Sequence, residues 1–195
     1  MGTIVSYIGY HSTDKENIQS IRKEGFSFNP NPKHWLGNGV YFFSDIALAK
    51  RWATRPPKGY GKILSPVVLK AKIISDKESV IDMRLLDHYN YIKKQYDLYV
   101  SFINNASLIV ENMNIDNQRC AFFNWLQKRL KMKVLIAYFD KRNPSKTTSN
   151  NSSFIMFHMP YIETQICVYD NTCISVINYI SFIHKNKKWS DENDF

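Results

Sequence analysis

Three short segments, far apart in the chain, carry side chains that could act together on a ligand. Residues 9–13 place His11 at the end of a β-rich stretch, directly before two hydroxyl residues. Residues 35–43 set Tyr41 behind a pair of glycines, and residues 163–170 hold an acid and an amide two positions apart. Imidazole donates and accepts hydrogen bonds, and aromatic faces stack on flat rings. These residue types suit a polar ligand that carries hydroxyl groups and an aromatic ring.

In order and in residue type, these segments resemble the strand motifs of the ADP-ribosyltransferase superfamily, on its diphtheria-toxin-like and poly(ADP-ribose)-polymerase-like side. That group carries a His-Tyr-Glu triad on three separated strands. Its aromatic-His-Gly-Ser/Thr motif matches residues 10–13, with Ser12 in place of Gly. Its Gly-x-Gly-Ile/Val-Tyr-Phe motif matches residues 37–42. The last-strand motif, which ends in Val-Tyr-Asp, aligns with residues 165–170, so Gln165 stands where the polymerases have Glu.

The resemblance implies that NAD⁺ is the substrate and that no metal takes part. Trp52 follows Tyr41 by eleven residues, which is the offset of a second aromatic that closes on the nicotinamide ring in the family. The implied catalytic residues are His11, Tyr41, Glu163 and Gln165. The implied NAD-binding residues are His11, Ser12, Thr13, Gly39, Tyr41 and Trp52.

The last-strand position leaves two candidates open. The alignment selects Gln165, whose carboxamide can hold a ribose hydroxyl but cannot act as a base. Glu163 lies two residues earlier, on the same face of a strand, and could supply a negative charge. We expect Gln165 to hold the ribose and Glu163 to orient or activate the acceptor. The missing Glu at the aligned position favours transfer of a single ADP-ribose over chain elongation.

Hydrophobic periodicity and turn residues predict a single α+β domain over residues 1–195. The resemblance implies two small antiparallel sheets that form an NAD cleft, with an inserted helical region. The expected strands are 4–10, 40–43, 67–74, 133–139, 154–159 and 164–169, and the expected helices are 13–24, 46–53 and much of 85–130. Residues 174–183 fit a strand or a helix. Residues 140–153 are expected to form a mobile loop, and 185–195 a frayed tail.

Local signals set some helix boundaries. Ser12 or Thr13 is a plausible N-cap for the first helix, and Gly25 should end it. Asp45 should cap the second helix.

Composition indicates the cellular compartment and the kind of partner that we expect. The chain has 195 residues, a net charge of +9 and three cysteines without a C-x-x-C pair, which favours a reducing, cytoplasmic setting. No apolar run approaches the ~18 residues that cross a bilayer, and we expect no membrane association and no cleaved secretory signal. The remaining histidines lack metal-ligand spacing. The basic balance raises the expectation of an anionic partner.

These observations predict a mono-ADP-ribosyltransferase that releases nicotinamide, with nucleic acid (RNA in particular) favoured over protein as the acceptor. A compact transferase of this kind suggests a toxin of a toxin–antitoxin or phage-defence system, with an antitoxin protein as partner. One alternative is a catalytically inactive module that binds NAD, ADP-ribose or nucleic acid. Another is a basic protein that binds RNA and ignores NAD.

Overall fold

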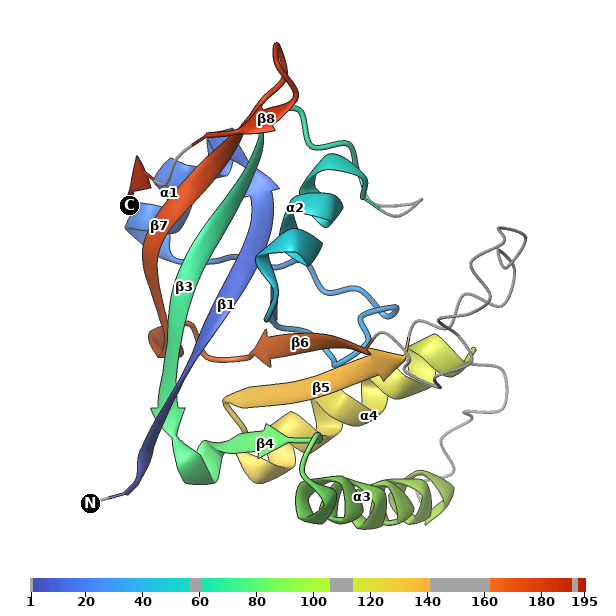
Figure 1. Cartoon of the computed structure of the whole chain (residues 1–195). Helices are drawn as coiled ribbons and strands as arrows, with labels where there is room; N and C mark the ends of the chain where they lie inside the picture. Colours follow the sequence, from blue (N-terminus) through green and yellow to red (C-terminus); the bar gives the residue numbers. More distant parts are fainter. Residues whose placement is uncertain (1, 57–60, 106–113, 141–161, 191–192) are drawn as a thin grey trace, which may run out of the picture.

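The computed structural model describes residues 2–56, 61–105, 114–140, 162–190 and 193–195. Apart from Asp140, the predicted loop 140–153 and the predicted strand 154–159 lie outside the described residues. Strands and helices alternate irregularly, so the fold is α+β, as predicted (Figure 1). Within the described part of the chain, no helix is long and apolar enough to cross a membrane.

Nine strands of the described residues form one hydrogen-bonded sheet. They are β1 (Ile4–Asp14), β2 (Val40–Phe43), β3 (Pro66–Asp76), β4 (Val80–Asp82), β5 (Val134–Asp140), β6 (Ile162–Val168), β7 (Ile174–Ile183), β8 (Lys188–Trp189) and β9 (Asn193–Asp194). Their order is β4-β5-β6-β2-β1-β3-β7-β8, with β9 also on β7. Among these nine strands of the described residues, β4 and β5 are the one parallel pair, and the other pairs are antiparallel.

The sheet consists of two blocks joined at one point. Strand β1 pairs with β3 along its whole length, but it meets β2 only where Tyr10 lies opposite Phe43. In Figure 1, β1, β3 and β7 run lengthwise, while β4, β5 and β6 run crosswise in the lower half of the view. The described strands thus form one mixed, continuous sheet, and the expected two small antiparallel sheets are not seen as distinct sheets. The reason is that the four-residue β2 pairs fully with β6 and still contacts β1.

Four α-helices of the described residues cover this sheet: α1 (Ile18–Glu24), α2 (Ile46–Thr54), α3 (Leu86–Asn105) and α4 (Ile115–Leu130). Strand β5 shows that different helices cover the two faces of the sheet. Val134 and Ile136 lie in a core cluster that contains α1 residues, whereas Leu135 and Ala137 lie in a cluster with α3 and α4. This alternation is the period of two expected for a strand that is buried on both faces. Strand β6, beside β5, is therefore covered on one face by α4.

The first helix begins later than predicted. Strand β1 extends to Asp14, and a 3-10 turn (Lys15–Asn17) precedes α1. The Asp14 carboxylate accepts from the backbone N–H groups of Leu64 (2.7 Å) and Ser65 (3.0 Å), which holds this residue in the extended strand. Asp14 is the N-cap of this 3-10 turn, and its side chain accepts from the Glu16 N–H. The N-cap of α1 is Asn17, not Ser12 or Thr13.

Two other boundary predictions are confirmed. Gly25 ends α1 with a positive φ of 80°, and its N–H donates to the Ile21 carbonyl at 2.9 Å. The Asp45 carboxylate accepts from the Ala47 N–H at 2.7 Å at the start of α2. Both residues do what their types favour at helix ends.

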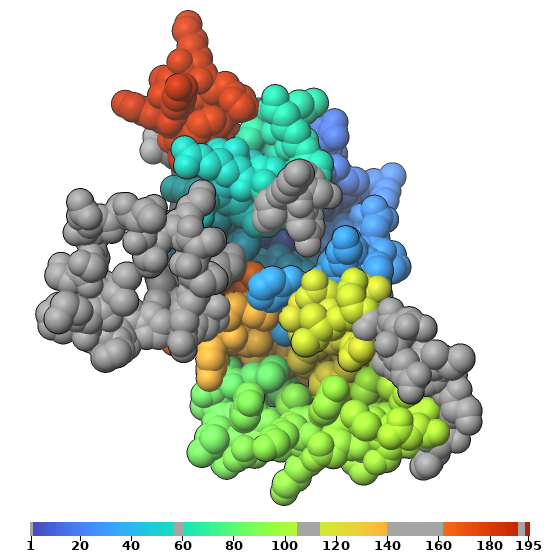
Figure 2. Space-filling model, turned by 90° about the vertical axis from the view of Figure 1, so that its right-hand side faces the viewer, coloured from blue at the N-terminus to red at the C-terminus, as the bar shows by residue number. Residues whose placement is uncertain are grey.

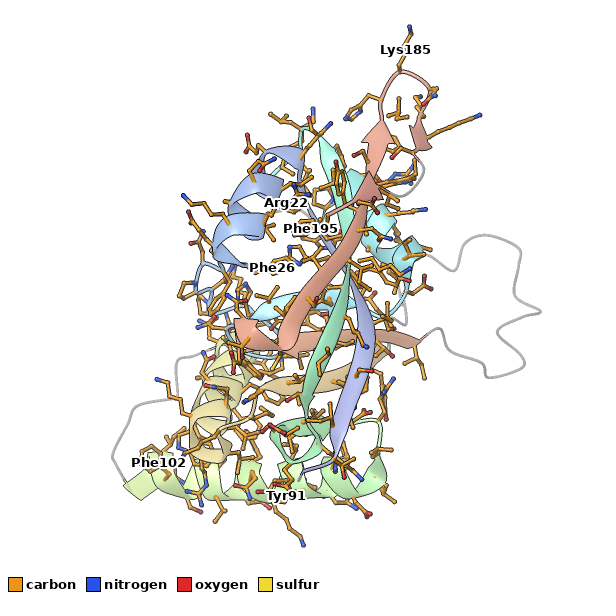
Figure 3. All side chains as sticks on the ribbon, turned by 90° about the vertical axis from the view of Figure 1, so that its left-hand side faces the viewer. Arg22, Phe26, Tyr91, Phe102, Lys185 and Phe195 are labelled. Carbon is orange, nitrogen blue, oxygen red and sulfur yellow. The ribbon has the colours of Figure 1, made fainter. Side chains whose placement is uncertain are left out.

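Residues 174–183 form a strand, and the segment predicted to be a frayed tail contains β8 and β9, which pair with β7. The Arg22 guanidinium lies 4.9 Å from the centre of the Phe195 ring, which joins the C-terminus to α1 (Figure 3). Cation–π contact and strand pairing together hold the described residues of this end against the sheet.

Candidate functional site

One cavity of about 500 Å³ lies where β2, β6, α2 and the segment 26–39 converge. Figure 2 shows this face, with α2 in cyan, the segment 26–39 in blue and α4 in yellow around a hollow. The lining residues are His11, Ser12, Ser27, Phe28, Asn29, Asn31, His34, Trp35, Gly39, Val40, Tyr41, Phe43, Trp52, Glu163 and Gln165.

Seven of the eight predicted site residues line this cavity: His11, Ser12, Gly39, Tyr41, Trp52, Glu163 and Gln165. They come from β1, the turn before β2, β2 itself, α2 and β6. Thr13 is the eighth and does not line it, since its hydroxyl is buried and accepts from the Asn17 side chain at 3.0 Å. The Ser12 hydroxyl donates to the Ala49 carbonyl at 2.6 Å, so it holds α2 against β1.

The hydrogen bonds of His11 define which nitrogen can meet a ligand. Its Nδ1 lies 2.8 Å from the Tyr41 carbonyl oxygen, which can only accept, so Nδ1 carries the proton. Phe26 and Phe42 pack against the ring, at centroid distances of 5.0 and 5.6 Å. Burial lowers the pKa of His11, which keeps the imidazole neutral at pH 7. Its Nε2 is then a hydrogen-bond acceptor, suited to a hydroxyl group.

Tyr41 offers its ring rather than its hydroxyl to the cavity. The hydroxyl donates to the Gly37 carbonyl and accepts from the Leu36 N–H, both at 2.7 Å. Burial raises the pKa of Tyr41, so it remains a neutral phenol. The two bonds fix the aromatic plane against the turn that precedes β2. This is the behaviour expected of a stacking surface.

Glu163 and Gln165 form a linked pair on β6. The Gln165 Nε2 donates to the Glu163 Oε1 at 2.5 Å, because a carboxylate can only accept. Glu163 is 1% exposed, and Gln165 is half-buried. Across the sheet, Glu163 lies opposite Phe139, and Gln165 opposite both Ala137 and Phe43. The structure thus places both candidates together at the cavity, with the amide oriented by the acid.

The wall formed by residues 27–35 was not predicted from the sequence. Here the Asn38 Oδ1 accepts from the Asn31 N–H and contacts the His34 Nδ1, both at 3.2 Å. The Asn38 N–H in turn donates to the Asn124 side chain on α4 at 2.7 Å. The Asn-Pro-Asn-Pro turn was visible in the sequence, but the wall docks through Asn38 onto Asn124, which lies 86 positions further along the chain.

The cysteines and the potential metal ligands outside the cavity do not form a second site among the described residues. Cys120, Cys167 and Cys173 are free and buried, which confirms Cys167 and Cys173 as small core residues. Among the described residues, no three His, Cys, Asp or Glu side chains gather in a way that could hold a metal ion.

Gly39 is required by close packing behind the cavity. A Cβ at this position would lie 2.7 Å from the Cys167 Sγ and 2.8 Å from the Val168 carbonyl oxygen. We expect Gly39→Ala to lower the free energy of unfolding by about 2 kcal/mol, because backbone must shift to relieve the overlap. Gly61→Ala is the matched control, since nothing lies within 4 Å of its Cβ position. Urea unfolding of both variants measures the difference, and equal stability would contradict close packing at Gly39.

Burial of histidine predicts an acid-sensitive fold. The pKa values of His11 and His34 are both lowered by burial, whereas an unfolded histidine titrates near pH ~6.5. Below that pH the unfolded chain binds protons that the native state excludes, so stability falls as pH decreases. We expect unfolding at pH 5.5 to cost about 1 kcal/mol less than at pH 7.5. The variant His11→Asn should flatten this slope in urea titrations, and an unchanged slope would show that His11 does not carry it.

The fold and the site define an α+β protein with a ligand-sized cavity lined by residues of three separated sequence motifs. No protein-family profile matches the chain. An uncharacterized protein of Methanocaldococcus jannaschii is 26% identical over 110 residues, which cover 55% of this chain and 49% of the relative. The match thus spans about half the length of that relative.

Proposed function

We propose that this protein is a mono-ADP-ribosyltransferase that cleaves NAD⁺, releases nicotinamide and transfers ADP-ribose to a macromolecular acceptor. One observation carries the proposal. His11 from β1, Tyr41 from β2 and the Glu163–Gln165 pair from β6 line the same cavity, and these are the residues that the resemblance to the three motifs of the ADP-ribosyltransferase superfamily selects. An ADP-ribosyltransferase-type fold, with its two sheets joined through β2, is part of the same proposal.

The chemistry of the cavity suits cleavage of a glycosidic bond. When the bond from ribose C1′ to nicotinamide breaks, its electron pair goes to the ring nitrogen and positive charge develops on the ribose. The Glu163 carboxylate is 1% exposed and lies at the cavity wall, where it can stabilise that charge. The free carbonyl oxygen of Gln165 and the Nε2 of His11 can accept from ribose hydroxyls. Such contacts accelerate the reaction if they strengthen in the transition state.

Aromatic rings supply the nicotinamide subsite. Tyr41 and Trp52 both line the cavity, and Tyr41 is fixed in plane by its two hydroxyl bonds. A flat cationic ring stacked between them would be held by dispersion and cation–π attraction. Ser12 and Gly39 contribute the walls at its side, where Gly39 lets the backbone approach closely.

Charge supports a nucleic acid over a protein as acceptor. Residues 26–55 supply most of the lining and carry four basic residues against one acidic residue. Transfer of a single ADP-ribose by a cytoplasmic toxin of a toxin–antitoxin or phage-defence system, held in check by an antitoxin, is consistent with this site.

A direct test is incubation of the chain with NAD⁺ labelled in the adenylate half, in the presence of cellular RNA, DNA or protein. Release of free nicotinamide with label on one pool would support the transferase. Thr13→Val is a useful control, because Thr13 belongs to the same motif but does not line the cavity. A folded chain that binds NAD⁺ and releases no nicotinamide would overturn the proposal.

The second candidate is a module that binds NAD or ADP-ribose without turnover. It is favoured by Gln165, which stands where the polymerases have Glu. Saturable NAD⁺ binding by calorimetry without nicotinamide release would select it.

A further inference from the structure

An aromatic and cationic pair stands at the mouth of the cavity. The Trp35 side chain is 40% exposed although it lines the cavity. The Arg119 guanidinium from α4 lies 4.8 Å from the indole centre, and its Nη2 is paired with the Asp116 carboxylate at 2.7 Å. The Phe139 ring of β5 lies 4.7 Å from Trp35 in an edge-on contact. A large indole is thus held in place by two elements, α4 and β5, while part of it faces solvent.

This pair lies next to the acidic residue of the site. Phe139 is directly opposite Glu163 in the antiparallel β5–β6 ladder. Opposite residues in such a ladder point to the same face with Cβ atoms about 5 Å apart. Because Trp35 contacts Phe139 and both Trp35 and Glu163 line the cavity, a group resting on Trp35 lies within reach of the Glu163 carboxylate.

We propose that Trp35 and Arg119 seat an unpaired base of a single-stranded nucleic acid, which is the acceptor of the transfer. The inference rests on the proposed function, and it names the acceptor class. Any base offers a flat face to an indole, and a guanidinium adds attraction to both base and phosphate. A second aromatic, Phe28, is 41% exposed at the same cavity, and exposed Lys33 lies in the same segment. Aromatic rings interleaved with cations are the usual surface for single strands.

A single strand is favoured over a duplex for a steric reason. The reacting atom of the base must reach C1′ of the nicotinamide ribose inside a cavity of about 500 Å³. A base within a duplex is stacked and paired, so it would first have to leave the helix.

The transfer step balances as follows. A nitrogen or oxygen of the acceptor forms a bond to C1′ while the bond from C1′ to the nicotinamide nitrogen breaks. The electron pair of the broken bond neutralises the pyridinium, and nicotinamide leaves as a neutral molecule. The proton of the acceptor group passes to the Glu163 carboxylate and then to water.

The test measures how cleaved NAD⁺ is partitioned between acceptor and water. Labelled NAD⁺ is mixed with a single-stranded oligonucleotide of mixed sequence, and label on the strand is divided by nicotinamide released. We expect Trp35→Ala and Arg119→Gln each to lower this ratio roughly tenfold, the size of one lost base-stacking contact. Arg129→Gln is the matched control, because Arg129 lies on the same helix, 5.3 Å from the Trp125 ring and away from the cavity. Its ratio should equal that of the wild type.

A second measurement separates the two proposals. Fluorescence anisotropy gives the affinity for the same oligonucleotide, single-stranded or annealed, without any turnover. Weaker single-strand binding by Trp35→Ala and Arg119→Gln, but not by Arg129→Gln, would support base binding by Trp35 and Arg119. This holds even if no nicotinamide is released, because that result would overturn the transferase proposal alone. Equal affinity and equal partition in all four proteins, or label on protein instead, would overturn the nucleic-acid seat while nicotinamide release still upheld the transferase.

Discussion

Replacing Glu163 with Gln is expected to lower nicotinamide release and ADP-ribosyl transfer by about 100-fold or more. The carboxylate is 1% exposed, so its charge acts through protein rather than water. Gln has the same shape and keeps a carbonyl oxygen that can accept from the Gln165 amide. The substitution therefore removes the charge that would stabilise the developing ribose cation and leaves packing largely intact. Single-turnover rates with labelled NAD⁺ measure the effect, and NAD⁺ affinity should change far less.

A control on the same strand separates charge from folding. Thr164 lies between the two residues, points to the other face of β6 and does not line the cavity, so Thr164→Ser should retain wild-type rates. Unimpaired turnover by Glu163→Gln would show that no negative charge is needed here. The catalytic contribution of β6 would then have to come from Gln165.

The pairing of these two side chains also predicts the effect of restoring the polymerase residue. In Gln165→Glu, two carboxylates would face each other across the 2.5 Å now bridged by an amide hydrogen bond. Like charges at that distance repel, so one of them must move or bind a proton. The amide at position 165 is therefore better read as the partner of Glu163 than as a lost catalytic acid.

The candidate site residues came from motifs that resemble those of the ADP-ribosyltransferase superfamily, and those motifs also carry local geometry that the sequence makes visible. Gly37 and Gly39 permit a turn and a close approach that few other residues tolerate, and Tyr41 follows them in register. His11 ends a segment whose β propensity is plain. Such patterns fix the backbone around one residue without reference to the remainder of the chain.

What the sequence could not specify depends on contacts between distant segments. The joining of the two strand blocks depends on a single register pair between Tyr10 and Phe43. The cavity wall at residues 27–35 is docked through Asn38 onto Asn124. The strand at 174–183 was ambiguous, because an apolar run with β-branched residues fits either structure until β3 provides its partner. Local propensity carries no information about such partners.

Replacing His11 with Asn is expected to weaken NAD⁺ binding about 10-fold and to lower kcat/KM about 100-fold. The Asn amide can take the place of Nδ1 and still donate to the Tyr41 carbonyl, which His11 now does at 2.8 Å. It cannot replace Nε2, the acceptor left for a ribose hydroxyl. The substitution thus removes the ligand contact and spares the structural one. His11→Ala loses both and should also be less stable to urea.

A matched histidine shows whether the effect belongs to the site. His184 also bonds a backbone carbonyl, that of Leu64 at 2.9 Å, but it is exposed and does not line the cavity. We expect His184→Asn to bind and turn over NAD⁺ as the wild type does, by calorimetry and by nicotinamide release. If His11→Asn matched His184→Asn in both NAD⁺ affinity and nicotinamide release, the imidazole of His11 would serve only to join β1 to β2. The ribose would then have to be held by other polar lining residues, Gln165 of β6 among them, because the Ser12 hydroxyl is already committed to Ala49 and that of Tyr41 to Gly37.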